Sequence, residues 1–531
     1  MLEETNKKLL NKSLKGIVKS SVIIFFILLA SNIVTYIYRL IIARYYGPEG
    51  YGLFSLAVMV VGIFTAIFSL GLTDGLSRFI PLYNGEKKSS KVKYLINYSL
   101  KILIITGLTG GIIMFFSSEL IANKIFHENN LTDILKLFSL LVPITLLINI
   151  FVVSLVSFEK VVLQSFIYNL VPNISRVILI TTFIILGFNF WAIFHSYFWS
   201  LFVLLLLSFI FYKRTIKFDS KDNLNYNGRK LVRSEMFNYS MPLILFALVI
   251  KTNTWIDSFA IGYFLNATEV GFYNSALPIA TLLLLTPQIF LQLFVPLINK
   301  EFAKKNNHLI KQMGQQVGKW IYAVNLPIFI LFFIFPEAII NILFGSEYIV
   351  AANSLRILSF GAFIYTLASS SEKLVLMAGK SRITLLNIVI TSVIGIILNI
   401  LLVPRLGIDG AAISTASIWV ILSIFLFVEG YYYTKIIPLR RKMIRITAMG
   451  FISLGLLLLL RSFIKINILS LIVLSLTFFL VYCLLLLISG SLDKNDWMVI
   501  KAIKGKAFGM KRNLKIITKK LNYLNFSKEK Q

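Results

Sequence analysis

The sequence predicts an all-α, polytopic membrane protein with about fourteen transmembrane helices. Three observations carry this prediction. Of the 531 residues, 57% are hydrophobic and only 14% are charged, and the mean hydropathy is +0.82, which excludes an ordinary soluble domain. The apolar runs reach the roughly 20 residues that a helix needs to cross a bilayer core. The two halves of the chain also repeat each other, at a spacing close to 220 residues.

Fourteen apolar runs define the predicted spans. Six lie in the first half, at 21–42, 52–73, 94–116, 134–156, 161–186 and 190–212. Six lie in the second half, at 237–262, 270–298, 320–344, 354–378, 382–404 and 408–428. Two more follow at 442–460 and 466–489, outside the repeat. We therefore expect two six-helix lobes and two extra C-terminal helices.

The repeat is visible at five places, in the same order in both halves. The matched segments are 49–54 with 269–273, 79–84 with 294–299, 136–139 with 356–359, Lys160 with Lys380, and 187–193 with 407–413. Because each copy holds an even number of helices, both copies begin and end on the same side of the membrane. The lobes should therefore be parallel, related by a pseudo-twofold axis along the membrane normal, and such duplicated bundles are typical of transporters.

The basic residues behind the formal net charge of +30 are distributed along the chain as expected for a multi-pass membrane protein. Most of the 53 Lys and Arg residues fall in the two tails and in alternate connections, whereas the intervening connections hold only a handful. By the positive-inside rule, both termini are cytoplasmic. We expect a multi-pass protein of the plasma membrane whose basic segments face anionic membrane lipids, without nucleic acid as a partner.

This topology divides the chain into six segments. They are a basic cytoplasmic tail (1–20), an N-lobe (21–212), a basic cytoplasmic linker (213–235), a C-lobe (236–428), two extra helices (429–489) and a second basic cytoplasmic tail (490–531). The linker is the longest polar segment between helices, so we expect it to act as a hinge that lets one lobe rock against the other.

Ionisable side chains inside predicted helices indicate a transport path, because they are costly in hydrocarbon. The cavity candidates are Arg39, Arg176, Lys251 and Asp257. Three of the four are cationic, which suits an anionic substrate, since Arg and Lys pair well with phosphate oxygens. Structural roles stay open for Arg39, which could extend to the membrane interface, and for Arg176, which could tie helices together. Asp74 and Arg78, four residues apart, predict an intrahelical salt bridge.

A compact Gly/Pro motif follows the first predicted helix. Its members are Arg44, Gly47, Pro48, Gly50 and Gly52, and they predict a short reversal at the outer face. Together with residues 70–72 and 78–79, the motif resembles the opening signature of polysaccharide-biosynthesis and oligosaccharide flippases. These form part of the multidrug/oligosaccharidyl-lipid/polysaccharide exporter superfamily. Segments 344–348, 378–380 and 398–412 resemble the same family.

The resemblance implies a MATE-like, V-shaped bundle of two six-helix lobes plus two helices. It also implies a transporter that flips a lipid-linked oligosaccharide, carried on a polyprenyl phosphate or pyrophosphate, for polysaccharide or glycoprotein biosynthesis. Members share a cationic central cavity, and by position Arg39 and Lys251 fit that cavity. Coupling to protons or sodium stays open, and neither a cofactor nor a metal is expected.

Other functions remain as alternatives. An enzyme is not expected, because the sequence holds no cluster of His, Cys and carboxylates and no nucleophile motif. A multidrug or cation antiporter of the related MATE family would favour buried acids, and Asp257 is the one plausible deep carboxylate against several buried bases. A non-transporting scaffold in envelope assembly is the third possibility.

Overall fold

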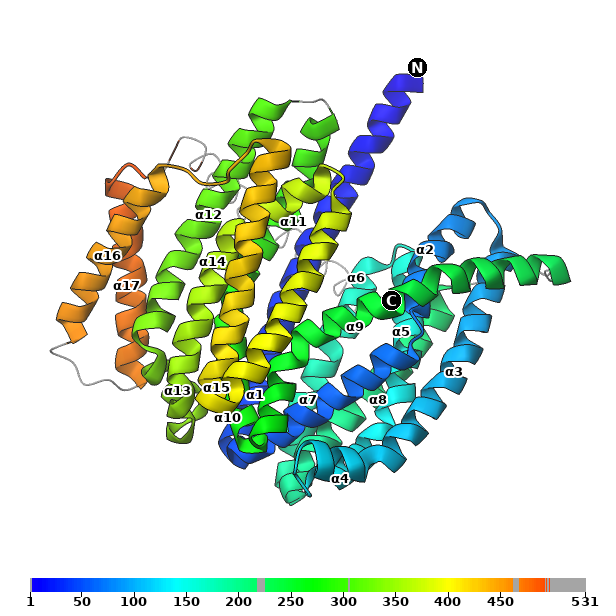
Figure 1. Cartoon of the computed structure of the whole chain (residues 1–531). Helices are drawn as coiled ribbons and strands as arrows, with labels where there is room; N and C mark the ends of the chain where they lie inside the picture. The colour runs from blue at the N-terminus through cyan, green and yellow to red at the C-terminus, as the bar shows by residue number, and fades with distance from the viewer. Residues whose placement is uncertain are drawn as a thin grey trace, which may run out of the picture.

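The computed structural model describes residues 2–216, 225–303, 306–461 and 468–491, together with 493 and 496. Every regular element within these residues is a helix (Figure 1). The predicted basic tail 1–20 begins the first helix, α1. Residues 217–224 of the predicted linker, and nearly all of the predicted tail 490–531, lie outside the described residues. The predicted all-α fold is confirmed.

The helices of the first half are α1 (Leu2–Phe68), α2 (Leu72–Gly85), α3 (Ser89–Leu120), η1 (Ile121–Ile125), α4 (Leu131–Ser139), α5 (Leu141–Ser157), α6 (Val161–Ser165), η2 (Phe166–Leu170), α7 (Val171–Ile185), η3 (Asn189–Trp191) and α8 (Ala192–Thr215). Those of the second half are α9 (Tyr226–Phe264), α10 (Ala267–Thr281), η4 (Leu282–Leu284), α11 (Leu285–Ala303), α12 (Asn307–Ile334), α13 (Pro336–Phe344), η5 (Ser346–Ala351), α14 (Ala352–Met377) and α15 (Ser381–Thr434). The last two are α16 (Lys442–Arg461) and α17 (Ile468–Ile488).

Two of these helices are too long to be single spans. The helices α1 and α15 contain 67 and 54 residues, and a bilayer core is only about 30 Å thick, or roughly 20 helical residues. Each is broken by a glycine with non-helical backbone angles, Gly47 (φ 71°) in α1 and Gly407 (φ 61°) in α15. Positive φ is readily adopted by glycine, so each glycine turns the chain back between two spans.

The number of spans agrees with the sequence. Within the described residues, nine helices are long and apolar enough to cross a membrane. Two bent pairs qualify as well: α4 with α5, bent by 40°, and the two halves of α9, bent by 50°. Counting each glycine-broken helix as two spans and adding the apolar helix Val473–Ile488 gives the fourteen predicted.

The bend between α4 and α5 has a direct cause in the sequence. Pro143 is the third residue of α5 and has no N–H to donate to the carbonyl of Ser139, the last residue of α4. The predicted single helix 134–156 is therefore divided into two pieces.

The backbone follows the predicted repeat. Gly187 (φ 79°) and Gly407 (φ 61°), matched at a spacing of 220, both turn the chain between two helices. Glu159 (φ 62°) and Gly379 (φ 76°), at the same spacing, end the preceding helices of the two halves. The two copies therefore share turn geometry as well as sequence.

The helices form two groups that meet at one end (Figure 1). Helices α2–α8 lie on one side of α1, and α10–α15 lie on the other. The groups approach each other at the end that carries α4, α10 and α13, which we call the signature end. They diverge toward the end where the N-terminus lies. The helices α16 and α17 pack against α12 at the outer edge of the second group.

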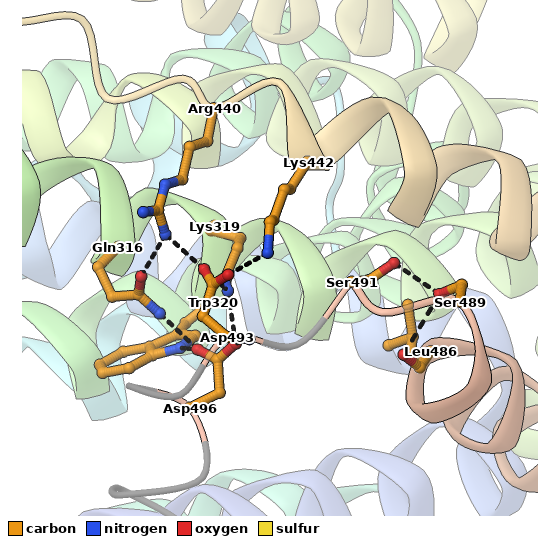
Figure 2. Close-up of polar contacts among 10 residues, drawn as sticks. All are labelled: Gln316, Lys319, Trp320, Arg440, Lys442, Leu486, Ser489, Ser491, Asp493 and Asp496. Carbon is orange, nitrogen blue, oxygen red and sulfur yellow. Dashed lines mark hydrogen bonds and ion pairs between the residues drawn. The ribbon is translucent and has the colours of Figure 1, made fainter.

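A buried ion cluster fastens the residues after α17 to α12 (Figure 2). Lys319 of α12 is only 1% exposed, and its Nζ lies 3.0 Å from Asp493 Oδ2 and 2.5 Å from Asp496 Oδ2. Arg440, between α15 and α16, and Lys442, the first residue of α16, also pair with Asp493. We call these five residues the C-terminal clamp.

Candidate substrate cavity

The predicted Gly/Pro motif lies at the signature end, where the two groups touch backbone to backbone. A Cβ atom on Gly52 would lie 1.7 Å from the carbonyl oxygen of Ala267, and one on Gly271 would lie 2.0 Å from that of Pro48. Gly52 and Gly271 are the pair that the repeat matches, so the same glycine of each copy makes room for the other copy. These glycines make a close seam between the groups.

Arg44 joins the groups at the same seam. Its Nε donates to the carbonyl oxygen of Leu343 at 2.7 Å, and its Nη2 donates to that of Ile342, both in α13. From the second group, the hydroxyl of Tyr348 donates to the carbonyl oxygen of Ala43 at 3.2 Å. The motif therefore closes one end of the molecule.

A cavity of about 410 Å³ opens farther along the molecule, beyond the seam. It is lined by the second half of α1, by α2, α5, α7 and α8, and by α9 around its bend. Two of the predicted site residues, Arg176 and Lys251, line this one cavity. Asp74 lines it too and is the only carboxylate among the described lining residues.

The guanidinium of Arg176 is held in place from three directions. Its Nε donates to Ser200 Oγ at 3.2 Å and its Nη1 donates to Asn173 Oδ1 at 3.1 Å. Its Cζ lies 4.3 Å from the centre of the Tyr197 ring. The hydrogen bond to Ser200 ties α7 to α8 through side chains, and the charge itself has no carboxylate partner within the described residues. A fixed, unneutralised guanidinium suits a phosphate oxygen.

Lys251 lies at the bend of α9, between the segments Tyr226–Val249 and Asn253–Phe264. Its side chain is exposed and contributes to the lining of the cavity. One turn on, Trp255 lines the same cavity, and its indole Nε1 is buried without a hydrogen-bond partner in the described part of the chain. The cavity therefore has two cations in its lining, and Trp255 is a lining residue that the sequence analysis missed.

Asp257 lies elsewhere, inside the second group. Its side chain is 6% exposed, and its carboxylate accepts hydrogen bonds from Tyr273 Oη (2.8 Å), Asn399 Nδ2 (3.0 Å) and Thr415 Oγ1. All three donors are neutral. The Oδ1 atom of Asn399 beside it is buried without a partner among the described residues. Asp257 is thus separate from the cavity, although it shares α9 with Lys251.

Arg39 is not part of the cavity lining either. It lies where α1 crosses α10, beside the hydroxyls of Tyr36 and Tyr51. Tyr51 donates to the carbonyl of Asn274 in α10 at 3.0 Å. Arg39 therefore lies between the two groups.

The predicted Asp74–Arg78 salt bridge is wrong. The guanidinium of Arg78 lies 4.3 Å from the centre of the Tyr239 ring in α9, and no ion pair joins it to Asp74 in the described structure. The first half of α9 packs against α2 and offers Arg78 an aromatic face, so Asp74 is left to line the cavity.

Comparison with known proteins now assigns the family. The model of the polysaccharide biosynthesis protein family matches residues 17–302, more than half of the chain. The chain belongs to the polysaccharide biosynthesis protein family. The MatE model also matches it, over residues 242–401. The resemblance inferred from the motif is confirmed.

Relatives of this polysaccharide biosynthesis protein support the same placement. It is 25% identical over 466 residues to an uncharacterised membrane protein of Methanocaldococcus jannaschii, covering 85% of this chain and 91% of the relative. It is 24% identical over 408 residues to the "Putative O-antigen transporter" of Shigella flexneri, covering 74% and 92%. Among solved structures, lipid II flippase MurJ in an inward closed conformation matches with a TM-score of 0.68 at 17% identity, covering 88% and 98%. This last likeness confirms the fold.

Proposed function

We propose that this protein flips a lipid-linked oligosaccharide across the plasma membrane by alternating access, for polysaccharide or glycoprotein biosynthesis. The observation that carries the proposal is the cavity that combines Arg176, Lys251 and the unpartnered indole N–H of Trp255 in a member of the polysaccharide biosynthesis family. The Shigella relative, by its name an O-antigen transporter, points to the same class of substrate. No enzymatic step is part of the proposal.

The proposed orientation places both termini in the cytoplasm and the signature end at the outer face. The two lobes, 21–212 and 236–428, then diverge toward the cytoplasm (Figure 1). A phosphate-bearing head enters from that side and pairs with Arg176, which is already fixed by Ser200 and Asn173. Lys251, on its longer and flexible stem, follows the phosphate, and the indole of Trp255 donates to the glycan. The polyprenyl tail stays in the lipid.

Release requires the opposite end to open. Rocking of the lobes would part the seam at Gly52 and Gly271 and break the two bonds from Arg44 to α13. The seam consists of these hydrogen bonds, two close backbone contacts and buried apolar packing in which the rings of Tyr51 and Phe344 stack, so opening has to replace all of them with new contacts. Arg39, between the lobes at the α1–α10 crossing, is proposed to meet the substrate as the path opens outward.

Asp257 is proposed as the site of ion coupling. A buried carboxylate surrounded by neutral donors has no countercharge, so it favours uptake of a proton or a sodium ion. The oxygens of Asp257, Thr415 and Asn399 suit sodium, and the Oδ1 of Asn399 has no other partner in the described residues. The test is transport into vesicles under an imposed sodium or proton gradient. Asp257→Asn should lose the dependence on the gradient, and an unchanged dependence would remove Asp257 from the coupling.

The MATE-type antiporter remains the alternative, because the MatE model matches residues 242–401 and Asp257 lies within them. That function would leave surface glycan unchanged when the protein is inactivated, and would instead lower resistance to cationic drugs. Measuring surface glycan and drug resistance in one strain that lacks the active protein therefore distinguishes a flippase from an antiporter.

The main test replaces the chromosomal copy with Arg176→Ala or Lys251→Ala. It measures surface glycan and lipid-linked sugar facing the cytoplasm. A hydrogen bond to a charged group is worth about 1.5–3 kcal/mol, so each variant should lower flux by about tenfold or more. Arg176→Lys should also be impaired, because Lys keeps the charge but cannot make both side-chain bonds.

The matched control is Lys136→Ala. Lys136 is another cation of a membrane helix, but its Nζ pairs with Asp133 at 3.3 Å on an exposed surface. This control should keep normal glycan at equal protein level. Normal glycan in both cavity variants would contradict the assignment of the cavity.

A further inference from the structure

A second and larger cavity lies away from the substrate cavity. Its volume is about 1240 Å³, and it is a groove between α3 and the first half of α9. The two cavities share no lining residue. The candidate transport path therefore does not explain this groove.

The groove is strongly basic. Five cations line it, and they are Lys93 and Lys101 of α3 with Arg229, Lys230 and Arg233 of α9. No Asp or Glu is among its lining residues in the described part of the chain. The nearby Glu235 of α9 is occupied elsewhere, because its carboxylate accepts the hydroxyl hydrogen of Tyr83. Lys93, Lys101 and Arg233 are like charges in one groove and repel each other, so an anion held among them would lower the energy of the folded protein.

The two faces of α9 explain why these cations are gathered. Val232, Met236 and Ser240, spaced by four, are buried on one face, where Met236 and Ser240 lie against Gly75 of α2. The face that carries Arg233 looks onto α3, and its Cζ lies 4.9 Å from the centre of the Tyr98 ring. Because the first face of α9 is buried, the face that carries Arg233 is directed toward α3. The aromatic ring of Tyr98 holds Arg233 in place without neutralising its charge.

The opposite end of the groove is apolar. Beyond Lys101 its lining continues with Ile102 and Ile105, and Ile105 is 65% exposed. Ser89–Ile125 is a candidate membrane span, and at 1.5 Å per residue Ile105 lies about 18 Å along the helix from Lys93. One end of the groove therefore matches a charged head, and the other matches a hydrocarbon chain.

We propose that this groove is a binding site for an anionic phospholipid of the cytoplasmic leaflet. Its phosphate would lie among Lys93, Lys101 and Arg233, and its acyl chain along Ile102 and Ile105. Basic pockets between membrane helices are a known means of binding such headgroups. The bound lipid would brace the first half of α9 against α3, on the N-terminal side of the bend at Lys251. The proposal is independent of the flippase assignment.

The test is native mass spectrometry of the full-length protein with phosphatidylglycerol or cardiolipin titrated against phosphatidylcholine. The variant Lys101→Gln/Arg233→Gln should bind the anionic lipid about tenfold or more weakly. The matched control is Lys124→Gln/Arg405→Gln, which removes two exposed charges outside the groove and should bind like the wild type. Thermal unfolding without added lipid should show a groove variant that is folded and no less stable than the wild type, because its loss of two cations reduces the repulsion within the groove.

Three results would overturn the proposal. Equal retention of anionic lipid by the groove variant would show that the groove does not hold it. Equal retention of phosphatidylcholine by the wild type would show that the cations do not select the headgroup. Displacement of the phospholipid by undecaprenyl phosphate at a much lower concentration would assign the groove to the carrier of the substrate.

Discussion

Replacing Lys319 with methionine should destabilise the protein by about 3 kcal/mol. The ammonium of Lys319 is 1% exposed and serves two carboxylates, Asp493 at 3.0 Å and Asp496 at 2.5 Å (Figure 2). After the change Asp493 still pairs with Arg440 and Lys442, and 18% of its side chain is exposed to solvent. The free energy lost at Asp493 is therefore small. Asp496 is 3% exposed and, among the described residues, keeps only neutral donors, namely Trp320 at 2.6 Å, Gln316 and a backbone N–H.

One uncompensated buried charge costs about 3–5 kcal/mol, and the remaining donors to Asp496 favour the lower end of that range. The assay is denaturant unfolding of the purified protein in mixed micelles. Lys311→Met is the control, because Lys311 is exposed on the same helix and makes no ion pair within the described residues. The double variant Lys319→Met/Asp496→Asn removes the uncompensated charge and should be more stable than Lys319→Met alone. A loss below about 0.5 kcal/mol, or strictly additive effects, would refute the reasoning.

Two further predictions follow from the clamp and the seam. Burial opposes ionisation of Asp496, but hydrogen bonds from Lys319 and Trp320 outweigh it and lower its pKa. Its contribution to stability is therefore complete above the ordinary carboxyl pKa of about 4 and is lost as the pH falls through the lowered value. Asp496→Asn should lower the melting temperature at pH 7, and the difference from wild type should shrink below about pH 4; a difference independent of pH would contradict this. At the seam, Gly52→Ala should abolish transport, because its Cβ would meet the backbone of Ala267, whereas Gly85→Ala, whose Cβ meets no atom within 4 Å, should transport normally. Normal flux from Gly52→Ala would show that the seam does not close during the cycle.

The sequence predicted the fold well because the signals that set it are long and redundant. An apolar run of twenty residues can be recognised as a membrane span without knowledge of its tertiary contacts. The glycines Gly187 and Gly407 mark the same connection between helices in the two copies of the repeat, so each supports the assignment of the other. The sequence was a poorer guide to the positions at which a helix is broken. The division of helix 134–156 at Pro143 is a local chemical event inside an otherwise uniform apolar run, and proline alone does not say how far a membrane helix will bend.

The site was predicted only in part. Ionisable side chains are costly in the hydrocarbon of a membrane, and this argument identified Arg176 and Lys251, which the structure places in one cavity. The same argument also identified Asp257 and Arg39, which lie elsewhere. Trp255 was missed, because an indole in a membrane helix is ordinary until its N–H proves to be buried without a partner in the described residues. Burial of single atoms depends on packing between helices that are far apart in sequence, and no pattern along the chain encodes it.

The helix α9 gives a physical basis for coupling the two proposed sites. Its first half is anchored to the N-terminal group, where Ser240 lies close against Gly71 and Gly75. Its second half is anchored to the other group through Asp257. Lys251 lies at the bend between the two anchors. Neutralising Asp257 would weaken the hydrogen bonds that hold the second half of α9 to its group. Binding an anion at Lys251 would act on the bend itself. Both events would therefore act on the bend angle of α9, and each would alter the angle at which the other is favourable. A single bent helix can therefore link the ion to the substrate without any contact between them.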